Sequence, residues 1–206
     1  LKSKNIHNVI NHYNGVDNEI FFNMNLQRKD FFVSISNIRR IKDIETLIDS
    51  FASFLKTYDH YKLVIIGKIY FDDYFNLLKK KVDKLNIAES VSFTNSLTHK
   101  EISKILNKSK ACLLTSESEG FPKVIIESIS TETPIIASDV GNISNISSGC
   151  GLIVQKGDII GFTNAMINIA ENDNFRKKCM HNCKKKFGLY DWTNLVKIID
   201  NEYSKT

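Results

Sequence analysis

Short apolar runs alternate with longer amphipathic segments from about residue 30 onward. The runs are rich in Val, Ile and Phe, and they predict six buried strands at 30–36, 61–67, 90–93, 110–116, 133–138 and 151–154. The other segments show a helical period or helix-start signals, which predict helices at 41–58, 71–87, 98–109, 122–130, 158–171, 173–187 and 191–203. Thr98 and Asp158 stand where helix-capping residues are expected, with Glu101 completing a capping box. Nearly continuous apolar strands that alternate with helices predict an α/β fold, a Rossmann-like parallel sheet with helices on both faces.

The composition is ordinary for a globular protein. Of 206 residues, 42% are hydrophobic and 25% are charged, and the net charge of +5 suits an anionic ligand or an anionic membrane surface. No apolar run is long enough to span a bilayer, and residues 1–15 lack the apolar centre of a signal peptide. The chain does not begin with Met and its first strand starts near residue 31, so we expect that the N-terminal part of a longer protein is missing.

Several residues that often carry chemistry have a simpler structural interpretation. The four cysteines form no disulfide pattern, which indicates a reducing cytosol. Cys179 and Cys183 flank His181 on one predicted helix, but a zinc site needs a fourth ligand, so small thiols packed on that helix are favoured and no metal is expected. His99 is expected at the surface where a helix starts, and Trp192 is expected to anchor the last helix in the core.

The stretch SESEGFPKVIIESIS, residues 116–130, carries the most specific pattern. Glu119 lies in a loop after a strand, Pro122 suits the first turn of a helix, and Glu127 follows Glu119 with seven residues between them. The amides of the first helical turn can bind phosphate, and carboxylates accept hydrogen bonds from sugar hydroxyls. A ligand with hydroxyls at both ends and phosphates in the middle, a nucleoside diphosphate sugar, fits this arrangement.

The segment E-G-F-P-x-V-x-x-E resembles the E-x7-E motif of retaining glycosyltransferases of the GT-B fold, a large family with many bacterial O-antigen, capsule and lipid-linked oligosaccharide enzymes. Other segments resemble that family in the same order, at 14–21, 36–51, 63–67, 91–106, 133–146 and 192–203. The resemblance covers residues 14–203 and matches only the C-terminal, donor-binding half of the two-domain enzyme. It divides the chain into an interdomain linker at 1–29, a nucleotide-sugar-binding domain at 30–188 and a C-terminal helix at 189–206.

The resemblance implies a role for each matched residue. Glu127 would hold the ribose, Glu119 would hold the sugar and stabilise its developing positive charge, and Lys42 would neutralise the departing diphosphate. Asn37 stands where the family has an arginine, so Arg39 or Arg40 would take that place. The expected catalytic residues are Glu119 and Lys42, and the expected donor-binding residues are Arg39, Lys42, Gly67, Thr94, Asn95, Glu119, Gly120, Phe121, Pro122, Lys123, Val124, Ile125 and Glu127.

The function implied is transfer of a hexose or N-acetylhexosamine from a nucleotide sugar, with UDP expected from family frequency, to a lipid-linked or polysaccharide acceptor. The enzyme would be cytoplasmic, at the inner membrane face, without cofactor, metal or nucleic acid. The acceptor site would belong to the missing N-terminal domain, so this chain alone is expected to bind donor but transfer little sugar. Two alternatives remain: a non-catalytic module that binds nucleotide sugars, and a nucleotide-sugar epimerase of GT-B-like fold. A dinucleotide dehydrogenase is disfavoured because no G-x-G-x-x-G follows a strand.

Overall fold

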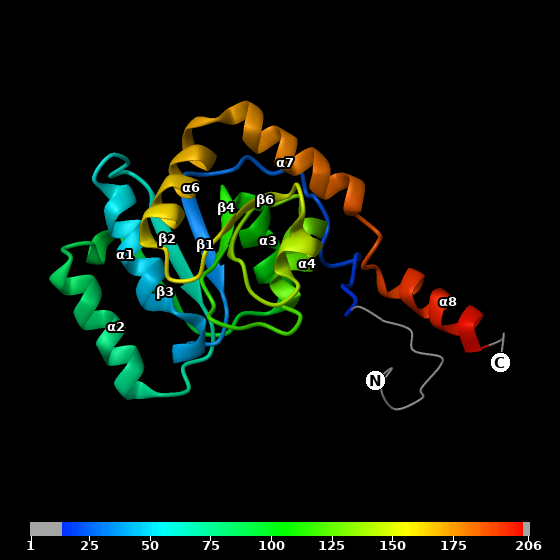
Figure 1. The fold of residues 1–206 in the computed structure, drawn as a ribbon, viewed down its shortest axis with the longest axis horizontal. Coiled ribbons are helices and arrows are strands. Elements are labelled where there is room, and N and C mark those ends of the chain that lie inside the picture. The colour runs from blue at the N-terminus through cyan, green and yellow to red at the C-terminus, as the bar shows by residue number, and fades with distance from the viewer. Residues whose placement is uncertain (1–13, 204–206) are drawn as a thin grey trace.

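A six-stranded parallel sheet forms the centre of the molecule (Figure 1). The computed structural model describes residues 14–203, so predictions that fall on residues 1–13 and 204–206 lie outside the described residues. The strands are β1 (Phe31–Ile35), β2 (Lys62–Ile66), β3 (Val91–Thr94), β4 (Ala111–Leu114), β5 (Ile135–Ser138) and β6 (Gly151–Val154). All six expected strands are confirmed, and their ends shift by no more than about two residues from the predicted ones.

The order of the strands is β3-β2-β1-β4-β5-β6. The chain therefore builds outward from β1 to one edge, returns to the middle and builds outward again from β4. The loops that follow β1 and β4 lead to helices on opposite faces of the sheet and leave a crevice at this reversal, which is where open parallel sheets bind ligands.

Helices cover both faces of the sheet, as predicted. One face carries α1 (Ile44–Leu55), α2 (Asp72–Lys84) and α6 (Ile159–Glu171), and the other carries α3 (His99–Lys108), α4 (Lys123–Ser130) and α5 (Ile143–Ser147). Helix α7 (Asp173–Lys186) packs against α4 and α6, and α8 (Trp192–Tyr203) extends away from the sheet (Figure 1). Neighbouring strand residues alternate between the two cores: Phe32 packs with the α1 side and Val33 with the α4 side, and both are fully buried.

Two local features differ from the prediction. The helix expected from residue 41 begins at Ile44, because Asp43 adopts a left-handed conformation (φ 44°) and its side chain caps the amide of Thr46 at 3.2 Å. Residues Arg40–Lys42 instead form a 3₁₀ turn, which sets Lys42 apart from the helix. Helix α5 was not predicted.

The two capping predictions are confirmed: Thr98 and Glu101 form a capping box, and Asp158 accepts from the amide of Gly161 at 2.9 Å.

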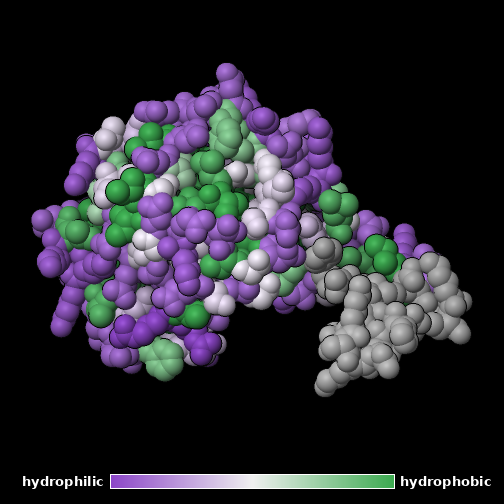
Figure 2. All heavy atoms as spheres, viewed as in Figure 1, coloured by the Kyte–Doolittle hydropathy of each residue, from purple (hydrophilic) through white to green (hydrophobic). Residues whose placement is uncertain are grey.

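Trp192 is not a core anchor, so that prediction is wrong. Its side chain is 48% exposed, and its ring lies so close to Gly15 that a Cβ there would be 2.4 Å from Cδ2. Val196 and Ile198 on the same helix are also 48% exposed. Figure 2 shows hydrophobic side chains on α8, whereas hydrophilic residues cover most of the remaining rim of this face.

Arg28, in the segment before β1, binds the ends of two helices. Its guanidinium donates to the carbonyls of Leu106 and Ser109 at the end of α3, and to those of Thr131 and Glu132 at the end of α4, at 2.7–3.2 Å. Burial lowers the pKa of Arg28 to about 10. This side chain therefore links the ends of two helices whose opposite ends border the crevice.

Within residues 14–203, no helix is both long and apolar enough to cross a membrane.

Candidate functional site

A hollow of about 370 Å³ lies between the loops that follow β1 and β4. It is at the carboxyl ends of the strands, which we call the carboxyl edge of the sheet. Its lining comes from these two loops, the start of α3 and the first turns of α4. The lining residues are Ile35, Ser36, Asn37, Lys42, His99, Ile102, Leu114, Glu119, Phe121, Pro122, Lys123, Val124 and Glu127. Seven of the expected site residues are thus brought together: Lys42, Glu119, Phe121, Pro122, Lys123, Val124 and Glu127.

A lysine and a serine hold Glu119 in place. The Lys42 ammonium lies 2.6 Å from Oε1 of Glu119, and the Ser116 hydroxyl donates to the same oxygen at 2.6 Å. The side chains of Lys42 and Glu119 are 20% and 9% exposed, so the pair is largely shielded from water. No hydrogen bond from residues 14–203 ends on Oε2 of Glu119, and this oxygen can accept from a ligand hydroxyl.

Backbone contacts fix the two loops that carry this pair. The hydroxyl of Thr115 donates to the carbonyls of Lys42 and Asp43 at 3.0 and 2.9 Å, and the amide of Glu117 donates to the carbonyl of Ile41 at 2.9 Å. Gly141 (φ 59°) supports the loop from the β5 side, since a Cβ there would lie 2.2 Å from the carbonyl oxygen of Glu119. The Lys42–Glu119 contact is therefore set by the backbone rather than by two mobile side chains.

Glu127 lies on the second turn of α4 in a different environment. Its side chain is half-buried, and burial raises its pKa to about 7, with the nearby Lys123 pulling in the opposite direction. Near neutral pH both protonation states are populated, so this carboxyl group can either donate or accept a hydrogen bond. Glu119 and Glu127 thus face one hollow with different electrostatic properties.

The start of α4 differs in detail from the prediction. Pro122 is the N-cap, outside the helix, and Lys123 is the first helical residue. The amide of Ile125 already donates to the carbonyl of Pro122 at 3.1 Å. The first-turn amides that helix geometry leaves for a ligand are therefore those of Lys123 and Val124.

Arg39 and Arg40 point away from this hollow. The guanidinium of Arg39 lies over the ring of Tyr70, and that of Arg40 over the ring of Tyr74, each at 4.9 Å from the ring centroid. Both arginines line a separate hollow of about 490 Å³ together with Ile41, Phe71 and Asp73. Neither arginine lies with Lys42 in the lining of the crevice.

Gly67, Thr94 and Asn95 also lie at the carboxyl ends of the strands, but they do not line the hollow of about 370 Å³. The amide of Gly67 donates to the carbonyl of Thr94 at 3.0 Å. A Cβ at Gly67 would be 1.9 Å from the carbonyl oxygen of Ser36, so glycine lets the loops after β1 and β2 approach each other. The side chain of Asn95 accepts from the amide of Ser96 at 2.8 Å. Gly120 lies in the loop after Glu119, where no atom would come within 4 Å of an added Cβ.

Ser36, Asn37 and His99 are polar lining residues that sequence reasoning did not include in the site, and His99 comes from a different element than the other two. It is exposed at the start of α3, as expected, and its ring lies 5.8 Å from the ring of Phe21 at an angle of 52°. A signal was available, because the Thr98–Glu101 capping box fixes His99 as the first helical residue after β3. Helix starts that follow parallel strands face the ligand edge of the sheet.

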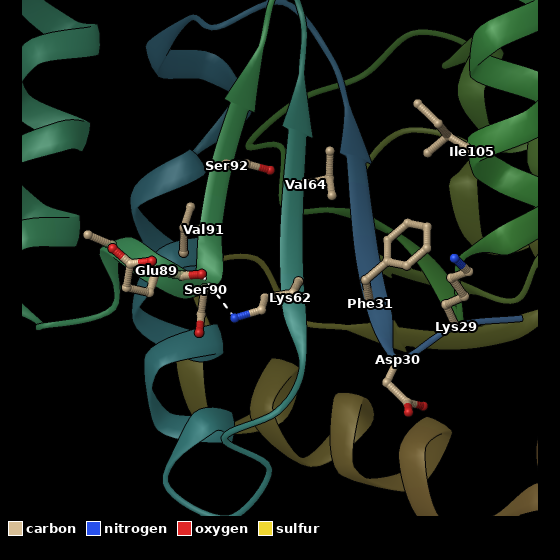
Figure 3. Close-up of a pocket in the computed structure, with 11 residues that line it drawn as sticks. Lys29, Asp30, Phe31, Lys62, Val64, Glu89, Ser90, Val91, Ser92 and Ile105 are labelled. Atoms are coloured by element: carbon tan, nitrogen blue, oxygen red, sulfur yellow. Dashed lines mark hydrogen bonds between the residues drawn. The ribbon is translucent and has the colours of Figure 1, made fainter.

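A larger hollow, about 570 Å³, lies at the amino ends of the strands, the amino edge of the sheet (Figure 3). Phe31, Val64 and Ile105 give it an apolar wall, and the Lys62 ammonium at its rim donates to the carbonyl of Glu89 at 3.0 Å. These residues lie toward the amino ends of β1, β2 and β3, away from the crevice. Lys29, Asp30, Lys62 and Glu89 line it as well, but within residues 14–203 no ion pair joins two of these four, whereas Lys42 and Glu119 form one in the smaller hollow.

The cysteines of α7 are packed inside the molecule. Cys179 and Cys183 are 1% and 0% exposed, and the thiol of Cys183 lies 3.9 Å from the carbonyl oxygen of Thr133. In the part of the chain that the structure describes, no group of three or more His, Cys, Asp or Glu side chains is arranged to hold a metal ion.

Several known proteins are similar in sequence to this chain. The chain is 26% identical over 199 residues to an uncharacterized glycosyltransferase, MJ1178, of Methanocaldococcus jannaschii. The aligned region covers 94% of this chain and 52% of that protein. It is 25% identical over 177 residues to N-acetyl-alpha-D-glucosaminyl L-malate synthase of Bacillus anthracis, with coverage of 80% and 45%. The chain therefore spans about half the length of these relatives.

A solved structure shows the same fold. Anabaena Alr3699/HepE, crystallised in complex with UDP and glucose, superposes with a TM-score of 0.84 at 18% identity, covering 95% of this chain and 56% of that one. The family model for glycosyl transferases group 1 matches residues 16–186. With the doubly wound sheet and the crevice at its reversal, this match shows that the chain belongs to the glycosyl transferases group 1 family.

Proposed function

We propose that this chain is the donor-binding half of a retaining glycosyltransferase that takes a hexose or N-acetylhexosamine from a UDP-sugar. The observation that carries the proposal is the convergence of Lys42, Glu119, Lys123 and Glu127 on one hollow at the reversal of the sheet. Two carboxyl groups and two cationic side chains share this hollow, which suits a ligand that carries both hydroxyls and phosphates.

Each end of the donor has a matching partner. Glu127, half-buried and near its pKa at neutral pH, would bind the ribose hydroxyls, because it can both donate and accept. The first-turn amides of Lys123 and Val124 would bind phosphate oxygens, aided by the helix dipole. Oε2 of Glu119 would accept from the sugar, and the open space beside Gly120 would admit the sugar ring.

The chemistry that this site would support is departure of the diphosphate. The bond from the anomeric carbon to the diphosphate oxygen breaks and the diphosphate leaves with the electron pair. The acceptor hydroxyl attacks from the same face, which retains the configuration, and its proton passes to the departing diphosphate. Lys42 would stabilise the leaving diphosphate, and Glu119 would stabilise the positive charge that develops on the sugar. Fixed cations and amides would supply the positive charge, so we propose a metal-independent reaction.

The acceptor is proposed to be a lipid-linked or polysaccharide chain at the cytoplasmic membrane face, bound by a second half of the enzyme. The coverage supports a second half, since matched relatives are about twice as long as this chain. The name of the Bacillus relative supports an N-acetylglucosamine donor, and the UDP and glucose in the Anabaena structure support a UDP-hexose.

Calorimetric titration of the 206-residue chain with UDP, GDP and ADP tests the donor assignment. We expect UDP to bind more tightly than GDP or ADP, and Glu127→Ala to weaken it about tenfold, because hydrogen bonds to charged groups contribute about 1.5–3 kcal/mol. A folded chain that binds none of the three, or binds them unchanged in Glu127→Ala, would refute the assignment. Incubation with a UDP-sugar and acceptor should yield little transfer by this chain alone.

A further inference from the structure

We propose that the ammonium group of Lys123, rather than the guanidinium of Arg39 or Arg40, is the second side-chain cation that holds the donor diphosphate. This inference rests on the proposed function and deepens it by assigning the residues that bind the two phosphates. Lys42 is the first cation, but it is already bonded to Glu119 at 2.6 Å. A diphosphate with a negative charge on both phosphates needs positive charge beyond that pair.

Lys123 lies where such a cation would be effective. It is the first residue of α4, it is exposed, and it lines the hollow that contains Lys42 and Glu127. Within residues 14–203, no carboxylate lies within ion-pair distance of its ammonium group. Its charge nevertheless reaches the site, since it lowers the pKa of Glu127 against the effect of burial.

The position of Lys123 is unfavourable for the helix itself. The N-terminus of a helix carries partial positive charge and favours anions, and the first turn of α4 contains no acidic residue to balance a lysine. Natural proteins tend to break such local rules at functional sites. A bound diphosphate would convert the repulsion between Lys123 and the helix N-terminus into joint binding of one anion.

A purely structural explanation for Lys123 is weaker. Lys123 and Glu127 lie four residues apart on one helix face, but lysine before glutamate is the less favourable order for such a pair. No ion pair between these two residues is formed within 4.0 Å. Stabilisation of α4 therefore does not account for the lysine.

The two arginines are held elsewhere by their aromatic partners. Arg39 and Arg40 each stack on a tyrosine, at 4.9 Å from the ring centroid, and they border a different hollow. Stacking on an aromatic ring stabilises a cation and fixes its orientation. Moving either guanidinium to the crevice would forfeit that contact.

NMR titration of the 206-residue chain with UDP and with uridine tests the inference. We expect Lys123→Ala to weaken UDP about tenfold and uridine less than about twofold, because only the phosphates interact with the lysine charge. Lys123→Arg should stay within about threefold of the unchanged chain. The double variant Arg39→Ala/Arg40→Ala should change UDP affinity less than about twofold, and so should Lys104→Ala, an exposed lysine on α3.

The outcomes separate this inference from the proposed function. Equal losses of UDP and uridine in Lys123→Ala, or a greater loss of UDP in the arginine double variant than in Lys123→Ala, would overturn the role of Lys123 while UDP binding itself stands. Absence of UDP binding by the unchanged, folded chain would overturn the proposed function and this inference with it. The melting temperature of Lys123→Ala should not fall, because the substitution removes a cation from a helix N-terminus.

Discussion

Two hollows of this molecule, one at the amino edge and one at the carboxyl edge of the sheet, differ in more than size. The amino-edge hollow is larger, about 570 Å³, and has an apolar wall with charges at the rim. The carboxyl-edge hollow is smaller, about 370 Å³, but two lysines and two glutamates converge on it, and the pKa of Glu127 is shifted to about 7. Volume alone would favour the amino-edge hollow as the ligand site, whereas the charged side chains and the sheet topology favour the carboxyl-edge hollow.

The difference follows from how the chain builds the sheet. The loops after β1 and β4 carry Lys42 and Glu119, and these strands are neighbours in the sheet although the two residues are 77 positions apart. At the amino ends of the strands, Lys29, Asp30, Lys62 and Glu89 also line the hollow, but within residues 14–203 no ion pair joins two of them. A parallel sheet therefore gathers loop chemistry at one edge, and a site is recognised by what its loops contribute.

The largest effect should be the difference in UDP affinity between two lysine substitutions, one at each hollow. We expect Lys42→Met to weaken UDP binding about 100-fold, because it removes a charged hydrogen-bond donor, a contribution of about 1.5–3 kcal/mol, and leaves Glu119 as an unbalanced anion. Lys62→Met, at the rim of the other hollow, should leave UDP affinity within about twofold. Calorimetry of both variants measures the contrast, and similar losses in both would contradict the choice of site.

A double variant separates direct binding by Lys42 from repulsion by Glu119. In Lys42→Met/Glu119→Gln the unbalanced carboxylate is gone, so folding stability should recover relative to Lys42→Met alone. UDP binding should nevertheless remain at least about tenfold weaker than in the unchanged chain, because the cation is still missing. Full recovery of binding in the double variant would show that Lys42 serves only to balance Glu119.

A smaller effect concerns the buried carboxyl group of Glu127. Its pKa rises from 4.5 to about 7 in the folded chain, so the folded state binds the proton more tightly than the unfolded state. The resulting stability is fully present below pH 4.5 and is lost as the pH rises to 7, by at most about 3 kcal/mol, since one pKa unit corresponds to about 1.36 kcal/mol.

Urea denaturation at several pH values tests this assignment. Glu127→Gln keeps the shape of the protonated side chain but cannot ionise, so its stability should fall less between pH 4.5 and 7 than that of the unchanged chain. At pH 8 the variant should therefore be the more stable of the two. The same pH slope in both proteins would mean that Glu127 is not buried as described.

The smallest effect concerns the space for the sugar. No atom would lie within 4 Å of a Cβ at Gly120, so Gly120→Ala should change folding stability by less than about 0.5 kcal/mol. We expect UDP to bind as before and UDP-glucose to bind a few times more weakly, because the methyl group narrows the space assigned to the sugar. Equal weakening of both ligands would move the sugar away from Gly120.

The six strands could be predicted because each is a short run rich in apolar residues, and β4 and β5 are buried at every position. Helix α5 could not, since Ile143–Ser147 offers only two apolar residues among serine and asparagine. The break before α1 was also missed. Apolar positions continue with a helical period through Ile41, Ile44 and Leu47, and nothing local shows that Asp43 adopts a left-handed conformation.

That Glu119 and Glu127 share one hollow could be predicted from the strand-loop-helix pattern, and Lys42 was expected there from the family resemblance. The direction of side chains could not be predicted. The direction of Arg39 and Arg40 depends on Tyr70 and Tyr74, which belong to another loop and helix. A one-dimensional pattern cannot show such pairings.

Mapping of the UDP site by amide chemical-shift changes tests the central claim most directly. In a ¹H–¹⁵N titration of the 206-residue chain, the account predicts the largest changes at residues 36–42 and 119–127, with little change around Lys62 and residues 89–92. Largest changes at the amino edge, around Phe31, Lys62 and Ser92, would contradict the account and assign the ligand to the larger hollow.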